Sequence, residues 1–272
     1  MRPIEEQVIL ITGATDGLGK GVALELARRG AGLLIHGRDQ HRIDATIKEL
    51  RDATQNTKLH GYCADFARLS AVRRLAEEVL AAESRVDVLV NNAGIGTHVP
   101  GGGVRQTSHD GHELRFAVNY LAPFLLTQRL VPRLTASAPA RIVNVSSIGQ
   151  QPLDFDNVML EHGYSGERAY CQSKLAQIMF TIDLGKQLEN AGVTVNALHP
   201  ATYMPTKIVE KPISTMEEGI AATMQLITSD ALDQTTGRYF NGQSEAQAKP
   251  QAYDADARSR LWQLSEELTA TP

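Results

Sequence analysis

The chain has 272 residues, a formal net charge of -4 and a pI of about 6.1. This length suits one large α/β domain, and a weakly acidic chain without a long Lys/Arg cluster argues against a nucleic-acid partner. The apolar runs are too short to span a membrane and no signal-peptide core is present, so we expect a cytoplasmic protein.

Strand-like apolar runs alternate with helix-like segments along the chain. The expected strands cover residues 8–12, 33–36, 59–64, 86–90, 141–145, 193–198 and 237–240. The expected helices cover residues 17–29, 42–53, 71–82, 113–134, 168–189 and 256–268. This alternation predicts an α/β fold in which a doubly wound parallel sheet is flanked by helices, with residues 1–272 forming a single domain.

Two Pro-containing segments, 148–167 and 203–214, each follow a strand at the carboxyl edge of the expected sheet. Ligands bind at that edge, so we expect both segments to cover the substrate. Their apolar residues would form a lipophilic mouth: Leu153, Phe155, Val158, Met159 and Leu160 in the first segment, and Tyr203, Met204, Ile208 and Val209 in the second. The alternative is a first segment that packs permanently on its own domain.

A glycine-rich turn joins the first strand to the first helix. Gly13 can make the turn, while Gly17 and Gly19 allow a pyrophosphate to approach the backbone at the helix start. We therefore expect this turn to bind a dinucleotide through Gly13, Thr15, Asp16, Gly17, Leu18 and Gly19. Because the spacing departs from GxGxxG, an ordinary turn is the alternative.

Tyr170 and Lys174 lie one turn apart on an expected helix. A phenol has an ordinary pKa near 10, and a nearby cation favours its ionised form, so Lys174 should bring Tyr170 toward the range of a general acid and base. A Tyr/Lys pair on a solvated helix face is the alternative. Ser146 and Ser147 end the strand 141–145, where a hydroxyl can donate to a reacting carbonyl oxygen.

The choice of nicotinamide cofactor depends on the end of the second strand. An acidic residue there contacts the ribose of NAD, whereas an arginine accommodates the 2′-phosphate of NADP. The strand ends at Gly37, and Arg38 follows it, which favours NADP(H); NAD(H) is the alternative. Asp39 is expected to cap the next helix.

Several motifs occur together in a fixed order: Thr12-Gly13-(x)3-Gly17-x-Gly19, Asn91-Asn-Ala-Gly94, Asn119, Ser146-Ser147 and Tyr170-(x)3-Lys174. With these motifs the chain resembles the short-chain dehydrogenase/reductase superfamily. The segment before Tyr170 and the tail after Gly242 resemble its retinol-dehydrogenase-like branch, which favours lipophilic substrates. The resemblance implies a Rossmann-type domain.

The resemblance also implies roles for individual residues. Ser147 would be the catalytic serine and Ser146 structural, and Lys174 would contact the nicotinamide ribose. Asn119 would hold a water that relays protons to Lys174, or else mark a helix kink.

Further positions would contact the cofactor by the same resemblance. Asp65 would lie near the adenine, and Asn92 near the adenosine ribose in the Asn92, Ala93 and Gly94 segment, although both Asp65 and Asn92 could be turn residues. Members of the family usually have a threonine five residues after the proline that corresponds to Pro200, whereas here Thr206 comes one residue later. Thr202 and Thr206 therefore both qualify as the contact to the nicotinamide carboxamide.

Together these patterns predict an NADP(H)-dependent oxidoreductase that transfers hydride between the nicotinamide and a carbonyl or alcohol carbon of a small molecule. A non-catalytic NADP(H)-binding regulator is the alternative. No metal site is expected, because His109 and His112 lack further ligands of a zinc-like pattern. Cys63 and Cys171 should be reduced thiols. Assembly into a homo-oligomer is compatible with the sequence.

Overall fold

Parallel strands form the centre of the molecule. The computed structural model describes residues 1–97, 103–202, 204–205 and 213–270. Its sheet has the order β3-β2-β1-β4-β5-β6-β7-β8, and the β7–β8 pair is antiparallel while the others are parallel. The strands are β1 (Val8–Ile11), β2 (Gly32–Gly37), β3 (Leu59–Cys63), β4 (Val88–Asn91), β5 (Ala140–Val145), β6 (Val193–His199), β7 (Arg238–Asn241) and β8 (Ser244–Ala246).

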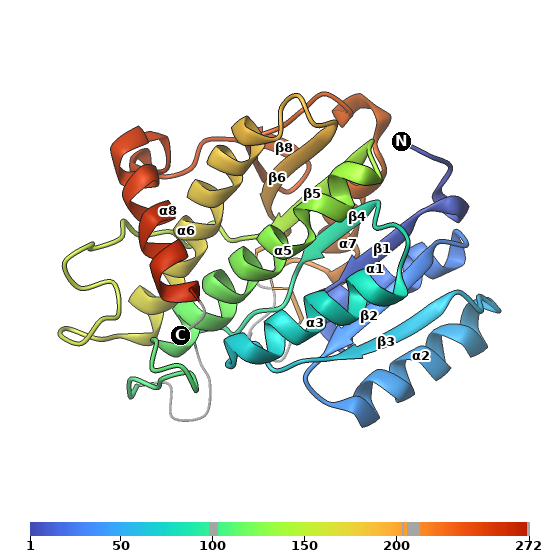
Figure 1. Cartoon of the computed structure of the whole chain (residues 1–272), viewed down its shortest axis with the longest axis horizontal. Helices are drawn as coiled ribbons and strands as arrows, with labels where there is room; N and C mark the ends of the chain where they lie inside the picture. The colour runs from blue at the N-terminus through green and yellow to red at the C-terminus, as the bar shows by residue number, and fades with distance from the viewer. Residues whose placement is uncertain (98–102, 203, 206–212, 271–272) are drawn as a thin grey trace.

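Helices cover both faces of this sheet, which confirms the predicted fold class (Figure 1). One face carries α3 (Leu69–Ala82), α5 (Ala122–Ala136) and α6 (Gly166–Gln187), and α8 (Ala255–Thr269) packs against α6. The other face carries α1 (Gly17–Arg28), α2 (Gln40–Thr54) and α7 (Met216–Thr228).

The central strands are apolar throughout because both of their faces are buried. In β1, Ile9 and Ile11 enter the core beneath α1, whereas Leu10 enters the core on the opposite face. Successive side chains of a strand point to opposite faces, so a continuous apolar run fills two cores.

The strand order reverses between β1 and β4, which are neighbours in the sheet although β2 and β3 separate them in the chain. Loops that leave neighbouring strands in opposite directions open a crevice at their carboxyl ends, where ligands of open α/β sheets bind. The glycine-rich turn after β1 and the Asn92–Gly94 segment after β4 both lie at this point.

The helix expected at 113–134 is present, but it contains a π-helical turn. It consists of α4 (Leu114–Phe116), a π-helical turn at Ala117–Leu121 and α5. The buried side chain of Asn119 within the π turn bonds to the backbone of Ile95, a long-range contact that apolar periodicity does not report. Helix α7 and strand β8 are additional elements that the sequence analysis did not predict.

The prediction of a lipophilic mouth is wrong for part of the segment 148–167. Leu153, Val158 and Leu160 are buried in the core rather than lining an opening. Leu160 even adopts a left-handed φ of 49°, a conformation that costs energy in a non-glycine residue and places its side chain inside. The backbone is fixed as well, since Gln172 donates to the Val158 carbonyl at 2.6 Å.

The second segment is described only in part. Tyr203, Ile208 and Val209 lie outside the described residues, while Met204 packs against the core beneath α7. In the part of the chain that the structure describes, no helix has the length and apolar composition needed to cross a bilayer.

Candidate active site

Residues at the ends of β1, β2 and β4 hold the glycine-rich turn in place. Gly13 and Gly17 have φ angles of 65° and 51°, which favour glycine. Asn92 Nδ2 donates to the carbonyls of Thr12 and Gly13 at 2.8 and 3.1 Å, and the Asn92 amide donates to Thr12 Oγ1 at 2.9 Å. Asn92 therefore acts as a turn-fixing residue, as its alternative role predicted.

Helix α1 begins directly after this turn. Asp16 accepts from the Gly17 amide at 2.9 Å and caps the helix, and Leu18 is buried below it. A Cβ on Gly19 would meet Gly13 O at 2.5 Å, so the packing of the helix against the turn by itself requires a glycine here. Ala93 also joins the turn, since its amide donates to Thr12 Oγ1 at 3.0 Å.

His36 is a contributor to this turn that the sequence analysis missed. The Gly13 amide donates to His36 Nδ1 at 3.2 Å, and Nε2 lies 3.0 Å from the Ala64 carbonyl, so the ring bridges two loops as a neutral imidazole with its proton on Nε2. Burial lowers its pKa to about 4, which keeps it neutral. Only its position before Gly37 at the strand end hinted at this role.

Charged groups gather where β2 ends. Arg38 is exposed, whereas Asp39 accepts from the Arg42 amide at 3.0 Å and caps α2, as predicted. Arg42, which the sequence analysis did not select, donates to Asp16 Oδ2 at 3.0 Å and to the Thr15 carbonyl at 3.3 Å. The guanidinium of Arg42 thus borders the turn, and the Asp39 carboxylate accepts from the first turn of α2.

The two serines after β5 face different partners. Ser146 Oγ donates to the Lys174 carbonyl at 2.7 Å and is a structural contact. The backbone of Ser147 is fixed by two hydrogen bonds, because its carbonyl accepts from Tyr239 Oη at 3.1 Å and from Gln150 Nε2 at 2.9 Å. Neither of these supports was evident from the sequence, because both come from distant or irregular segments.

Ser147 and Tyr170 meet beside Gly149. A Cβ on Gly149 would lie 3.5 Å from Ser147 Oγ and 3.7 Å from Tyr170 Cε1. Burial raises the pKa of Tyr170, and a hydrogen bond with Ser147 opposes that rise. The phenol is therefore protonated at neutral pH and lies next to a hydroxyl, the arrangement that a proton donor to a carbonyl oxygen requires.

Lys174 is buried on the same helix face, with Nζ 5.7 Å from the centre of the Tyr170 ring. Burial lowers the pKa of Lys174 to about 7. The sequence analysis expected the lysine to lower the pKa of Tyr170, but in this structure desolvation of the phenol outweighs the cation. The physical reason is that Nζ donates to other groups, Val145 O at 2.9 Å and Gln177 Oε1 at 3.0 Å.

Asn119 borders this pair from the π turn. Its Nδ2 donates to Ser173 Oγ at 3.0 Å and to Ile95 O at 3.1 Å, and its Oδ1 accepts from the Ile95 amide. A Cβ on Gly94 would lie 3.2 Å from Asn119 Oδ1 and 3.6 Å from Lys174 Nζ. A side chain at this position would therefore crowd Asn119, and the glycine lets the backbone lie close to both side chains. π turns are frequent at functional sites.

The remaining expected cofactor contacts have local partners. Asp65 Oδ1 accepts from the Ala67 amide at 3.0 Å, which is its turn role. Pro200 and Thr202 line a hollow beside β7, and Thr202 Oγ1 lies 3.0 Å from His199 Nε2. Thr206 lies outside the described residues.

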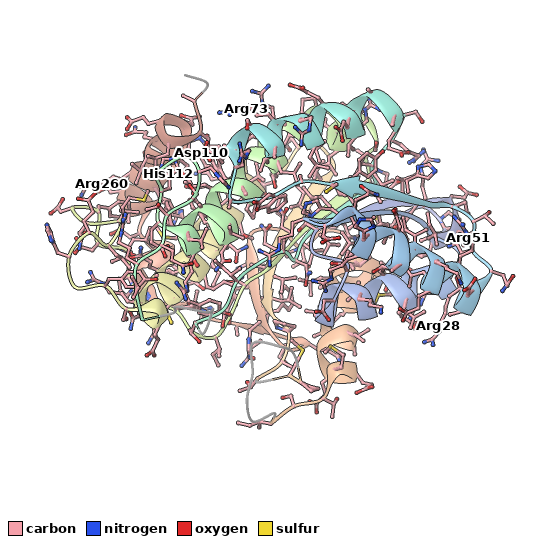
Figure 2. The ribbon with its side chains drawn as sticks, turned by 90° about the horizontal axis from the view of Figure 1, so that it is seen from below. Arg28, Arg51, Arg73, Asp110, His112 and Arg260 are labelled. Carbon is pink, nitrogen blue, oxygen red and sulfur yellow. The ribbon has the colours of Figure 1, made fainter. Side chains whose placement is uncertain are left out.

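The cysteines and histidines do not add chemistry to this site. Cys63 and Cys171 are free thiols, and burial raises the pKa of Cys171 to about 11, which disfavours a reactive thiolate. Asp110 and His112 lie close together near Arg73 (Figure 2), and Asp110 accepts from the Leu69 amide at the start of α3. Across the described ranges, no three His, Cys, Asp or Glu residues are grouped to hold a metal ion.

Residues 7–217 match the family model described as short chain dehydrogenase. The chain belongs to the short-chain dehydrogenase family. It is thus an α/β oxidoreductase of the kind that uses a pyridine nucleotide and a small-molecule substrate, and its Ser147, Tyr170 and Lys174 lie together at the strand ends.

Among relatives, this short-chain dehydrogenase is 36% identical to human retinol dehydrogenase 13 over 97% of the chain and 85% of that protein. It is 34% identical to human retinol dehydrogenase 12, covering 96% and 86% of the two chains. These relatives confirm the resemblance to the retinol-dehydrogenase-like branch.

Solved structures share the fold. A Mycobacterium paratuberculosis protein is 31% identical with a TM-score of 0.78, covering 97% of this chain and 93% of that one. The NADP complex of Pseudomonas aeruginosa RhlG is 25% identical with a TM-score of 0.71, covering 89% and 97%.

Proposed function

We propose that this protein is an NADP(H)-dependent oxidoreductase that interconverts carbonyl and alcohol groups of lipophilic small molecules. The observation that carries the proposal is the meeting of Ser147 and Tyr170 beside Gly149, with Lys174 one helical turn away. A regulator that only binds NADP(H) has no use for a protonated phenol beside a hydroxyl and a buried lysine.

In the proposed reduction, Tyr170 donates its proton to the carbonyl oxygen as negative charge develops there, and Ser147 Oγ donates a hydrogen bond to the same oxygen. The nicotinamide supplies the hydride. Lys174 stabilises the tyrosinate that remains and holds the nicotinamide ribose. In alcohol oxidation Tyr170 acts as the base.

Cofactor-binding roles are proposed for the residues around the crevice. The turn from Gly13 to Gly19 would hold the pyrophosphate, and Ala93 and Gly94 would line the path toward the nicotinamide. Pro200 and Thr202 would border the carboxamide. Asn119 would hold a proton-relaying water beside Lys174, while its own side chain keeps the π turn in place.

The overall function is tested by following NADPH oxidation with a panel of aldehydes, ketones and quinones. Turnover of several lipophilic carbonyls is the expected result. If NADPH binds but no carbonyl is reduced and no alcohol is oxidised, the regulator alternative is favoured instead. Cytoplasmic location and homo-oligomer formation stay predictions, which cell fractionation and light scattering test.

Arg38 supports the preference for NADP(H), since its guanidinium is exposed where β2 ends. Arg38→Leu should weaken NADPH binding by about one to two orders of magnitude, because a charge-assisted contact to the 2′-phosphate contributes roughly 1.5–3 kcal/mol. NADH binding should change little, since NADH has no such phosphate. Fluorescence titration of both cofactors measures the two affinities.

Arg51→Leu is the matched control, because Arg51 lies on the outer side of α2 near its end (Figure 2). It should leave both affinities unchanged. Equal affinity of the unmodified protein for NADPH and NADH would overturn the cofactor assignment. If Arg38→Leu keeps the preference for NADPH over NADH, the contact to the 2′-phosphate would be assigned to Arg42.

A lipophilic substrate is supported by the retinol dehydrogenase relatives and by Ile148, which follows Ser147 and is 54% exposed. We expect kcat/KM to rise along a series of aldehydes of increasing chain length at saturating NADPH. Each well-buried methylene contributes up to about 0.8 kcal/mol, or roughly fourfold. A flat or falling series would favour a polar substrate.

A further inference from the structure

Gln177 accepts one of the hydrogen bonds that the Lys174 ammonium group donates. It lies three residues after Lys174 on α6 and is 1% exposed, and its Oε1 accepts from Lys174 Nζ at 3.0 Å. The Val145 carbonyl accepts a second hydrogen at 2.9 Å. A lysine ammonium has three donors, so these two contacts leave one hydrogen for a further partner.

Neutral acceptors are the groups that stabilise this buried cation. The two printed acceptors of Lys174 Nζ are the Val145 carbonyl at the end of β5 and Gln177 Oε1 on α6. Tyr170 is the titratable group that faces Lys174 in the described part of the chain, and burial is the cause that lowers the pKa of Lys174. Among the described residues no carboxylate is paired with Lys174, so its hydrogen bonds to Gln177 Oε1 and the Val145 carbonyl are the contacts that stabilise the charged form.

The other end of the Gln177 side chain is costly to bury. Its Nε2 atom is buried and has no hydrogen-bond partner among the residues that the structure describes. A buried donor without a partner destabilises a fold, and an apolar residue of the same length would avoid that cost. Folding alone therefore does not explain a glutamine here, whereas the contact of its Oε1 atom with Lys174 does.

We propose that Gln177 is a positioning residue that holds the Lys174 ammonium beside Tyr170 and stabilises its charge. The inference rests on the proposed roles of Lys174 and Tyr170 in proton transfer. Gln177 is almost fully buried and its Oε1 contacts Lys174, so it acts through Lys174.

Two substitutions separate the effect of the hydrogen-bond acceptor from the effect of the side-chain volume. Gln177→Met keeps the length of the side chain but removes the acceptor, whereas Gln177→Glu keeps an acceptor and adds a negative charge. Lys174 is titrated by NMR in protein labelled with ¹³C at the lysine ε carbons, and its signal is assigned with Lys174→Met.

Gln177→Met should move the Lys174 titration midpoint down by about one pH unit or more, and Gln177→Glu should move it up. At neutral pH, kcat for alcohol oxidation should fall about tenfold in Gln177→Met while KM stays within about twofold, because a larger fraction of Lys174 has lost its charge. The pH at which kcat changes should follow the midpoint in each variant.

Gln172→Met is the matched control, since Gln172 is a fully buried glutamine on the same helix that donates to the Val158 carbonyl instead of contacting Lys174. It should leave the Lys174 midpoint unchanged even where the melting temperature falls. A midpoint that is the same in the unmodified protein, Gln177→Met and Gln177→Glu overturns the proposal. The titration requires no turnover, so a shifted midpoint in a protein that reduces no carbonyl would refute the proposed function and leave the contact with Lys174 supported.

Discussion

Replacing Tyr170 with phenylalanine is expected to lower kcat by about three orders of magnitude while NADPH binding changes by no more than a few fold. The substitution removes one oxygen and its transferable proton. Burial raises the pKa of Tyr170, so the proton is present at neutral pH, and the ring remains to fill its place beside Gly149. Steady-state rates of NADPH oxidation and a fluorescence titration of NADPH measure the two effects separately.

Tyr120→Phe is the matched control for this experiment. Tyr120 is fully buried and its hydroxyl is hydrogen-bonded to Ser265 in the core, remote from Ser147. Its loss should cost about 1 kcal/mol of stability and leave kcat intact. If Tyr170→Phe keeps more than about a tenth of the activity, another group transfers the proton and the proposed mechanism is wrong.

The sheet could be predicted because its signals are local. The central strands are short apolar runs, as in β1, and they alternate with helices, some of which begin at a capping residue such as Asp39 at α2. Parallel strands with buried faces require exactly this pattern, so fold class follows from alternation alone. Helix α7 also has a start signal, the capping box of Thr215 and Glu218, which we missed because it directly follows the segment that we interpreted as a substrate cover.

The contacts that shape the candidate site could not be predicted, because they join residues distant in the chain. His36 bridges Gly13 and Ala64, and Tyr239 supports the Ser147 carbonyl from 92 residues away. No propensity or spacing reports such pairs. The motifs identified which residue types gather at the strand ends, whereas their protonation depends on burial, which only the folded arrangement determines.

The apolar residues of segment 148–167 illustrate the same limit. Leu153 and Val158 were equally compatible with an exposed mouth and with a packed loop, since hydrophobicity says only that they need cover. The structure buries both. Ile148, which the prediction did not name, is exposed next to Ser147 and is the residue of this segment on which we base the proposed lipophilic contact.

Replacing each of the two neighbouring serines with alanine should give effects on kcat/KM that differ by about two orders of magnitude. Ser147→Ala should lower kcat/KM about a hundredfold or more, because it removes a donor to the oxygen on which negative charge develops. Ser146→Ala should change kcat/KM only a few fold, since Ser146 Oγ donates to the Lys174 carbonyl and faces away from the substrate. Its loss should instead reduce stability by about 1 kcal/mol.

The pair is its own control, because each variant removes the same hydroxyl from adjacent positions. Rates with one aldehyde at saturating NADPH give kcat/KM, and urea unfolding gives the stability of each variant. The Ser147 backbone is held by Tyr239 and Gln150, so Ser147→Ala should not displace the loop. If Ser146→Ala is the more damaging change for catalysis, the assignment of roles at the end of β5 is reversed. Ser146 would then be the residue that faces the reacting oxygen, and the hydrogen bond of Ser147 with Tyr170 would be structural.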